Sequence, residues 1–271
     1  MFDPEQNTPF FPAVNANCER LGYRLAGDPH GQVLAVTHGW AADSEFTIPL
    51  AELFPSFKVM LIDLPGYGLS ASLADSSKDF DSVAKLISNT VPAHSVLMSW
   101  SLSTLYAIRA CSLGSFTPSA LITICGSPRF PDEKGNPGFN QHYIQKLNLS
   151  FNAKNAERLI KLFYTIQGIG AVGEAIKASF ARFTIPSYEV LQSGILHMTQ
   201  GDERENLMNL SIPKLHLFGK QDLLVPSKQA SLLANSKNTT VHIFEQSAHL
   251  PFITEKKAFT QSVINFLNNI K

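Results

Sequence analysis

Short apolar runs alternating with amphipathic stretches form the main pattern of this 271-residue chain. Apolar runs bounded by turn residues are typical of strands buried on both faces of a sheet. Amphipathic stretches between them, such as 80–91, predict helices that join parallel strands. We therefore expect an α/β fold with a mostly parallel central sheet and helices on both faces. The predicted strands are 22–26 (at an edge), 33–37, 59–63, 96–98, 120–125, 214–219 and 240–244.

The pattern changes from about Pro128 to His197, where strand-like runs are absent and several helices with Gly and Pro breaks between them are expected. The clearest helix is 153–167, with an apolar face formed by Ala156, Leu159, Ile160, Phe163 and Ile166. A helical insertion between two parts of an α/β sheet is typical of a lid over a site. We expect a core of residues 1–126 and 199–271 and a helical cap of residues 127–198, with a loose N-terminal arm up to about Asn15.

Unusual residues stand where predicted strands end, at His38-Gly39-Trp40, Asp63 and Ser101. The carboxyl ends of parallel strands meet at one edge of a sheet, where ligand sites form. Ser101 is the middle residue of Ser99-Trp100-Ser101-Leu102-Ser103, a variant of the G-x-S-x-G turn that exposes a nucleophilic serine between a strand and a helix. Serine tolerates strained dihedral angles less well than glycine. A strand–turn–helix with a solvated serine is the alternative interpretation.

A serine hydroxyl becomes nucleophilic only when a base removes its proton and an acid orients that base. Ser101, Asp222 and His249 occur in the order expected of α/β-hydrolases, and each follows a predicted strand. The alternatives are that Asp222 caps a helix starting near Pro226 and that His249 is a surface loop residue. We predict that the three form a catalytic triad.

Three rival residues fit the expected order or position less well. Asp63 precedes Ser101 in the chain, so we interpret it as a structural acid that holds the following loop. Ser70 and Ser103 do not directly follow a predicted strand. For the oxyanion of the transition state we expect two backbone N–H groups, those of Leu102 and Trp40.

Several motifs together narrow the family. They are His38-Gly39-Trp40, Asp63-Leu-Pro-Gly-Tyr-Gly-Leu-Ser70, Trp100-Ser101-Leu102, Ser127-Pro128-Arg-Phe130, Gly219-x-x-Asp222-x-x-Val225-Pro226 and Ala248-His249-x-Pro251-Phe252-Ile253. With them the chain resembles the pimeloyl-[acyl-carrier protein] methyl ester esterases of biotin synthesis, from about Val33 onward. The resemblance implies the α/β-hydrolase fold and a serine carboxylesterase that releases methanol from the methyl ester of pimeloyl-acyl-carrier protein.

The resemblance also implies a set of substrate contacts and no metal or organic cofactor. The implied contacts are Trp40, Ser101, Leu102, His249 and the cap residues Phe163, Tyr164, Thr165, Ile166 and Gln167. The apolar face of the cap helix would line the acyl channel. Serines replace both glycines of the serine turn, which we expect to affect the rate more than the class of reaction.

Acyl-carrier proteins are acidic, so their docking surface should be basic. Residues 127–198 contain eight lysines and arginines against five acidic residues, an excess of three positive charges. Of the arginines that the family uses there, Arg158 matches, whereas Leu162 stands where another is expected. We expect docking around Arg158 with Lys154, Lys161 and Lys177; an ordinary solvated helix face is the alternative.

The charge balance and the cysteine content indicate which partners and which cellular compartment to expect. Lysine and arginine total 22 and so do aspartate and glutamate, so there is no net attraction to nucleic acid or an anionic membrane. Three separated cysteines indicate reduced thiols, and we expect Cys111 and Cys125 to fill the core. We expect a cytoplasmic monomer without a signal peptide. A general short-chain carboxylesterase or thioesterase, or a non-catalytic ligand-binding protein of the same fold, remain alternative functions.

Overall fold

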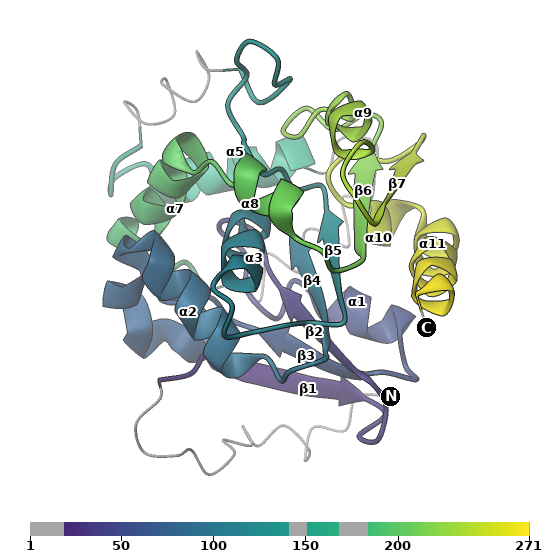
Figure 1. Ribbon diagram of the computed structural model, residues 1–271. Helices are drawn as coiled ribbons and strands as arrows, with labels where there is room; N and C mark the ends of the chain where they lie inside the picture. Colours follow the sequence, from purple (N-terminus) through teal and green to yellow (C-terminus); the bar gives the residue numbers. More distant parts are fainter. Residues whose placement is uncertain (1–18, 141–150, 168–183, 271) are drawn as a thin grey trace.

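The computed structural model describes residues 19–140, 151–167 and 184–270, and these contain one seven-stranded sheet in the order β1-β3-β2-β4-β5-β6-β7 (Figure 1). The strands are β1 (Tyr23–Gly27), β2 (Val33–Thr37), β3 (Lys58–Ile62), β4 (Val96–Trp100), β5 (Ala120–Ile124), β6 (Lys214–Gly219) and β7 (Thr239–Phe244). Strand β1 is antiparallel to β3, and every other neighbouring pair is parallel. The mostly parallel sheet with its edge strand is as the sequence predicted.

Helices cover both faces of this sheet, which also confirms the prediction (Figure 1). They are α1 (Ile48–Leu53), α2 (Phe80–Thr90), α3 (Ser103–Ser112), α5 (Ala156–Gln167), α7 (Tyr188–Gln200), α8 (Arg204–Asn209), α9 (Gln229–Leu233), α10 (Pro251–Thr254) and α11 (Lys256–Asn269), with a 3₁₀ segment at Gly68–Lys78. Helices α2, α3 and α8 pack together on one face, whereas α1, α10 and α11 lie on the other.

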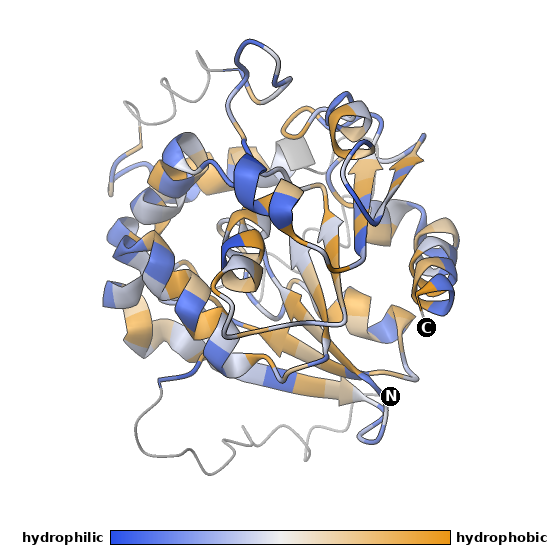
Figure 2. Cartoon of the chain, viewed as in Figure 1, coloured by the Kyte–Doolittle hydropathy of each residue, from blue (hydrophilic) through white to orange (hydrophobic). Residues whose placement is uncertain are grey.

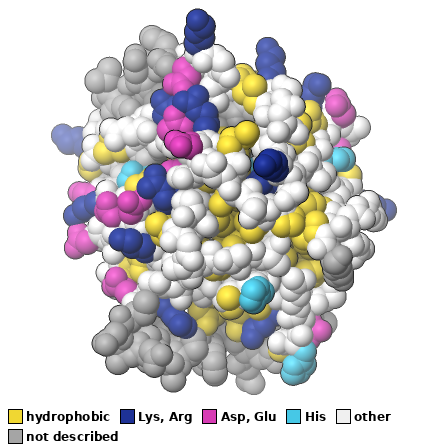
Figure 3. All heavy atoms as spheres, viewed as in Figure 1, with side chains coloured by type: hydrophobic (Ala, Val, Ile, Leu, Met, Phe, Trp, Pro, Cys, Tyr) yellow, Lys and Arg dark blue, Asp and Glu magenta, His cyan; other side chains and the backbone are white. Residues whose placement is uncertain are grey.

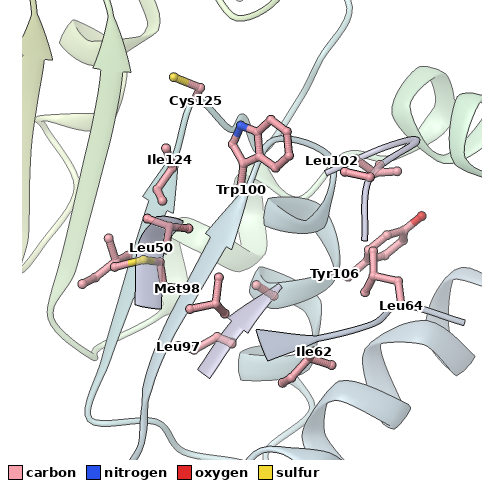
Figure 4. Close-up of a cluster of buried hydrophobic side chains, with 14 of the residues drawn as sticks. Leu50, Ile62, Leu64, Leu97, Met98, Trp100, Leu102, Tyr106, Ile124 and Cys125 are labelled. Carbon is pink, nitrogen blue, oxygen red and sulfur yellow. The ribbon is translucent and has the colours of Figure 1, made fainter. Parts of the chain in front are cut away.

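The core lies where these helices meet the sheet. Every residue of β4 and β5 is buried, because both strands have neighbours on each side and helices above and below. Apolar colouring follows the strands and the inward faces of the helices (Figure 2). Figure 4 shows part of this cluster, in which Trp100 and Ile124 are paired residues of adjacent strands and Tyr106 of α3 lies beside Leu64 and Leu102.

The inserted segment begins with a stretch that is not helical. Residues 128–140 form an irregular loop closed by a bridge between Pro131 and Phe139. Helix α5 starts at Ala156, and α7 ends at Gln200, past the predicted boundary at 198. Three prolines and two glycines between 128 and 138 explain the absence of a helix there. The predicted N-terminal arm lies outside the described residues.

Helices α5 and α7 lie beyond the carboxyl ends of the strands (Figure 1). Helix α7 packs against the 3₁₀ segment, and its residue Leu191 accepts a hydrogen bond from the Trp40 indole. Both helices therefore cover the edge where the predicted site residues gather. In the described parts of the chain, no helix has the length and apolar character needed to cross a membrane.

Candidate active site

Ser101 stands at a strained turn between β4 and α3. Its backbone has φ 57°, in the left-handed region that side chains rarely adopt, and its N–H donates to the Ile124 carbonyl at 2.9 Å. The hydrogen bond to β5 holds this conformation. The N-terminus of α3 begins two residues later, so its dipole favours negative charge near Ser101.

The two serines that replace glycines in this turn are both buried and hydrogen-bonded. Ser99 Oγ lies 3.3 Å from the Thr104 hydroxyl. Ser103 Oγ accepts from the Thr37 hydroxyl at 2.9 Å and from the Trp100 N–H at 3.1 Å. Because these partners satisfy both hydroxyls, the turn keeps its shape without glycine.

His249 lies within hydrogen-bond distance of both other residues of the predicted triad. His249 Nε2 is 2.9 Å from Ser101 Oγ, and His249 Nδ1 is 2.7 Å from Asp222 Oδ2. All three are buried, and the Trp100 indole donates to the His249 carbonyl at 3.2 Å. A neutral imidazole in this position donates through Nδ1 and accepts from the serine through Nε2.

Asp222 also organises its own loop after β6. Its second oxygen, Oδ1, accepts from the N–H groups of Leu224 at 2.8 Å and Val225 at 3.1 Å. These bonds leave Oδ2 directed at His249. Helix α9 begins at Gln229 and has no side-chain cap, so the alternative that Asp222 caps a helix near Pro226 is wrong.

The rival residues have other partners. The Asp63 carboxylate accepts from the Ser44 N–H at 2.6 Å and from the Leu69 N–H at 2.9 Å. Ser70 Oγ donates to the Asp63 carbonyl at 2.7 Å. These contacts hold the loop after β3, as expected of a structural acid.

The turn His38-Gly39-Trp40 follows β2 and lies against the serine turn. A Cβ placed on Gly39 would be 3.1 Å from the Ser101 Cβ, so the absence of a side chain permits this approach. His38 Nε2 accepts from the Leu64 N–H at 2.9 Å, and Nδ1 therefore carries the proton and donates to the Gly39 carbonyl at 2.8 Å. Burial lowers the pKa of His38 and keeps it neutral.

Two N–H groups at this junction are available to an oxyanion. Within the described residues, neither the Trp40 N–H nor the Leu102 N–H donates to another protein atom. Leu102 precedes α3, and Trp40 adjoins the glycine that touches Ser101. This is the arrangement expected of an oxyanion hole.

The Trp40 side chain joins the core to both cap helices. Its indole N–H donates to the Leu191 carbonyl of α7 at 2.8 Å, and its ring meets Phe163 of α5 edge-on at 4.9 Å between centroids. A Cβ on Gly194 would lie 2.5 Å from Trp40 Cδ1. Gly194 thus allows α7 to approach the turn His38-Gly39-Trp40 closely, and we call this turn the oxyanion turn.

The residues of the predicted cap segment lie in different environments. Phe163 is half-buried against Trp40, and Tyr164 is buried with its hydroxyl donating to the Ala41 carbonyl. Thr165 is exposed, and its hydroxyl donates to the Lys161 carbonyl within α5. The side chains of Ile166 and Gln167 lie outside the described residues.

The predicted docking residues that the structure describes lie on α5 or just before it. Lys154 is exposed in the turn that precedes α5, Arg158 is exposed on the helix, and Lys161 pairs with Glu157 at 2.6 Å. Leu162 on the same helix is 55% exposed. Lys177 lies outside the described residues. On the face seen in Figure 3, basic and acidic side chains are interspersed.

Sequence reasoning missed two residues near the site. Cys125, expected only to fill the core, follows β5 at φ 44° with its sulfur within 4.8 Å of ligand atoms of Asp222 and His249. Burial raises the pKa of its thiol well above the usual value, which keeps it neutral. Its place at the end of the predicted strand 120–125 was the available signal. The second missed residue is Asp43. Burial and the nearby Asp63 raise its pKa to about 7.

Among the described residues, these same three side chains form a group that could offer metal ligands. Asp222 and His249 are 2.7 Å apart. Two ligands of one tetrahedral zinc, each at about 2.0–2.2 Å, lie more than about 3 Å apart. The observed spacing therefore suits a hydrogen bond.

The site is closed in this arrangement. Ser101 is 4% exposed. A neighbouring space bordered by Leu102, Tyr106 and Val190, but not by the triad residues, measures about 10 Å³, room for no more than one water molecule. A larger hollow of about 810 Å³ lies between β7 and α11 and is lined by none of the site residues.

Comparisons with known proteins agree with this geometry. A sequence model of the alpha/beta hydrolase family matches residues 33–261. A pimeloyl-[acyl-carrier protein] methyl ester esterase from Pectobacterium carotovorum is 30% identical over 240 residues, covering 86% of this chain and 93% of that protein. The protein of that name from Legionella pneumophila (strain Lens) is 31% identical over 246 residues, covering 89% of this chain and 98% of that protein.

Solved structures share the fold. An esterase from Exiguobacterium antarcticum superposes with a TM-score of 0.78 at 21% identity, covering 92% of this chain and 95% of that one. A hydrolase from Oleispira antarctica has a TM-score of 0.80 at 20% identity with the same coverage. The chain therefore belongs to the alpha/beta hydrolase family and, within it, to the family of pimeloyl-[acyl-carrier protein] methyl ester esterases.

Proposed function

We propose that this protein is a serine carboxylesterase that converts the methyl ester of pimeloyl-acyl-carrier protein to pimeloyl-acyl-carrier protein and methanol. The observation that carries the proposal is the hydrogen-bonded chain from Ser101 Oγ through His249 to Asp222, at 2.9 and 2.7 Å. The names of the relatives at about 30% identity supply the substrate.

Acylation uses the three side chains in sequence. His249 Nε2 takes the proton from Ser101 as Oγ attacks the ester carbonyl carbon. The Trp40 and Leu102 N–H groups donate to the oxyanion that forms, and Asp222 stabilises the imidazolium. His249 then gives the proton to the methoxy oxygen, methanol leaves, and an acyl–Ser101 ester remains.

Deacylation repeats these steps with water. His249 removes a proton from water, which attacks the acyl carbonyl, and the same N–H groups hold the second oxyanion. Protonated His249 returns its proton to Ser101 Oγ as the acid is released. The resulting carboxylate remains at the distal end of an acyl chain still attached to its carrier.

The closed site requires the cap to move during turnover. Ser101 is 4% exposed, so a seven-carbon chain with its carrier reaches Oγ only when α5 and α7 separate from the oxyanion turn. The apolar face of α5, including Phe163, then becomes available to the acyl chain. The carrier docks on the outer face of α5, near Lys154 and Arg158.

The direct test compares two substrates with purified protein. Methanol release from pimeloyl-acyl-carrier protein methyl ester is measured beside hydrolysis of a p-nitrophenyl ester of similar chain length. We expect kcat/KM to favour the carrier-linked ester by at least about tenfold, since carrier contacts add binding energy.

Three outcomes would contradict the proposal. Equal kcat/KM values on both substrates indicate a general carboxylesterase, and preferential cleavage at the thioester indicates a thioesterase. Absence of Ser101 labelling by a fluorophosphonate, with no hydrolysis of either substrate, indicates a binding protein. Growth of a biotin auxotroph that lacks this esterase provides an independent check. We expect the gene for this protein to restore growth only if the protein cleaves the methyl ester of pimeloyl-acyl-carrier protein.

A further inference from the structure

A cap tyrosine is hydrogen-bonded to the backbone that follows the oxyanion turn. Tyr164 of α5 donates through its hydroxyl to the Ala41 carbonyl at 2.5 Å. The two residues are 123 positions apart, and the bond crosses from the cap to the core. Ala41 directly follows Trp40, so Tyr164 holds the Ala41–Ala42 peptide, two peptide groups after the one that carries the expected oxyanion donor, the Trp40 N–H.

The backbone at this position depends on its contacts. Ala41 has φ 55°, a left-handed conformation that costs about 1–3 kcal/mol for a residue other than glycine. Its N–H faces the Tyr67 hydroxyl at 3.4 Å, a long contact, whereas its carbonyl has the short bond from Tyr164. The bond from α5 is therefore the stronger of the two polar restraints on this residue.

Tyr164 is oriented away from solvent. It is 3% exposed, its ring packs edge-on against Phe46 at 5.3 Å, and Phe46 stacks on Trp100 below the site. Burial and the nearby Asp43 raise the pKa of Tyr164 well above the usual value, so its hydroxyl stays a donor. A side chain used in this way contacts the protein and not an acyl chain in the closed state.

We propose that Tyr164 is a positioning residue that locks the oxyanion turn when α5 is seated on the core. The inference rests on the proposed function. Seating of the cap forms the Tyr164–Ala41 bond, which fixes the Ala41–Ala42 peptide. This restrains the backbone dihedral angles of Ala41 and Trp40, and so keeps the Gly39–Trp40 peptide oriented with its N–H toward the reacting carbonyl. Opening of the cap releases the turn, so full oxyanion stabilisation arises only with the substrate enclosed.

The test is Tyr164→Phe in the full chain, with Tyr188→Phe as the matched control. Tyr188 of α7 also donates a hydroxyl to a carbonyl, that of Phe151 at 3.2 Å, but both partners lie in the inserted segment. We expect Tyr164→Phe to lower kcat about tenfold with KM within twofold, because misplacement of a donor weakens transition-state binding. Tyr188→Phe keeps the wild-type kcat.

A second readout separates positioning from stability. A trifluoromethyl ketone forms an oxyanion adduct with Ser101, and its inhibition constant should rise by the same factor as kcat falls. A raised KM with unchanged kcat would show that Tyr164 binds substrate and would overturn the proposal. So would equal losses in both variants, or wild-type kcat in Tyr164→Phe. If wild-type protein shows no Ser101-dependent hydrolysis, the proposed function itself fails and the positioning role fails with it.

Discussion

The sheet edge and the cap hold their residues around Ser101 by different means. Ser101, Asp222 and His249 each follow a strand, and local hydrogen bonds such as that from the Ser101 N–H to β5 fix their backbone. Helices α5 and α7 are attached near Ser101 by side-chain hydrogen bonds. Tyr164 of α5 donates to the Ala41 carbonyl, and the Trp40 indole donates to the Leu191 carbonyl of α7. The reacting groups thus rest on a rigid base, whereas the cover is joined to it by a small number of side-chain contacts.

We infer from this difference that the sheet edge holds the reacting groups, whereas the cap helices control the access of substrate to them. A parallel sheet buried on both faces resists local opening, so we expect the 2.7 and 2.9 Å distances of the triad to persist during the proposed opening of the cap. The cap contacts can break and re-form because each is worth little alone. Substitutions at the sheet edge should therefore abolish the chemistry, and substitutions in the cap should reduce it.

The largest effect is expected at the nucleophile. Ser101→Ala removes the attacking oxygen and should lower kcat by a factor on the order of 10⁶ with little change in thermal stability. Ser70→Ala is the control, because Ser70 is buried but its hydroxyl donates to the Asp63 carbonyl. Steady-state hydrolysis of a p-nitrophenyl ester measures both, and a Ser70 loss as large as that of Ser101 would contradict the assignment.

The second-largest loss of kcat is expected at Asp222, the acid of the triad. Asp222→Asn should reduce kcat about 10⁴-fold, because the amide no longer favours the required tautomer and charge of His249. Asp63→Asn should instead lower the free energy of unfolding by roughly 1–3 kcal/mol, because its buried hydrogen bonds hold a loop. Kinetics and urea unfolding of both variants separate the two roles; a catalytic loss confined to Asp63→Asn would reverse them.

Acid should weaken the sheet through His216 in β6. Burial and the nearby Lys214 lower the pKa of His216 to about 3. Since an unfolded histidine titrates near pH 6.5, only the unfolded state binds the proton between these values. Stability due to this group is complete above about pH 6.5 and falls by about 1.4 kcal/mol per unit as the pH drops toward 3. Urea unfolding from pH 7 to 4 measures the slope.

Replacement of His216 should reduce the dependence of the free energy of unfolding on pH between pH 7 and 4. His216→Gln lowers stability at pH 7 but should reduce its dependence on pH, whereas replacement of the exposed His30 by Gln should leave the wild-type slope. An unchanged slope in His216→Gln would show that another buried group dominates acid unfolding.

A smaller effect is expected where α7 touches the oxyanion turn. Gly194→Ala places a methyl group 2.5 Å from Trp40 Cδ1 and 3.2 Å from Leu102 Cδ2, which forces α7 outward. We expect kcat/KM to fall about tenfold, since overpacking displaces the donor loop. Ser193→Ala, one residue earlier in α7, should retain wild-type kcat/KM. Full activity of Gly194→Ala would show that α7 can shift without disturbing Trp40.

The smallest effect concerns the outer face of the cap. Arg158→Glu should lower kcat/KM for the carrier-linked ester about three- to tenfold, because exposed charge pairs contribute up to about 1 kcal/mol. Small esters should be unaffected. Lys257→Glu on α11 introduces the same charge change on the other side of the sheet and should affect neither substrate. An equal loss on carrier-linked and small esters in Arg158→Glu would exclude a docking role.

The sequence determined the sheet and the order of the residues along its edge. Buried strands such as 120–125 were predictable because short, continuous apolar runs are typical of strands covered on both faces. The site was predictable at the strand ends because the carboxyl ends of parallel strands meet at one edge of the sheet. Ser101 and His249 followed from the turn motif and the chain order. The length of the loop after β5 was not predictable, because prolines and glycines there only exclude a helix.

Only the tertiary structure decided which partners these residues have. The sequence could not show that Asp222 divides its two oxygens between its own loop and His249, or that Tyr164 bonds to Ala41 across 123 positions. Nor could it show that Cys125 lies beside the triad. Hydrophobic periodicity is a local property that fixes where elements form, whereas hydrogen bonds between distant side chains depend on how those elements pack.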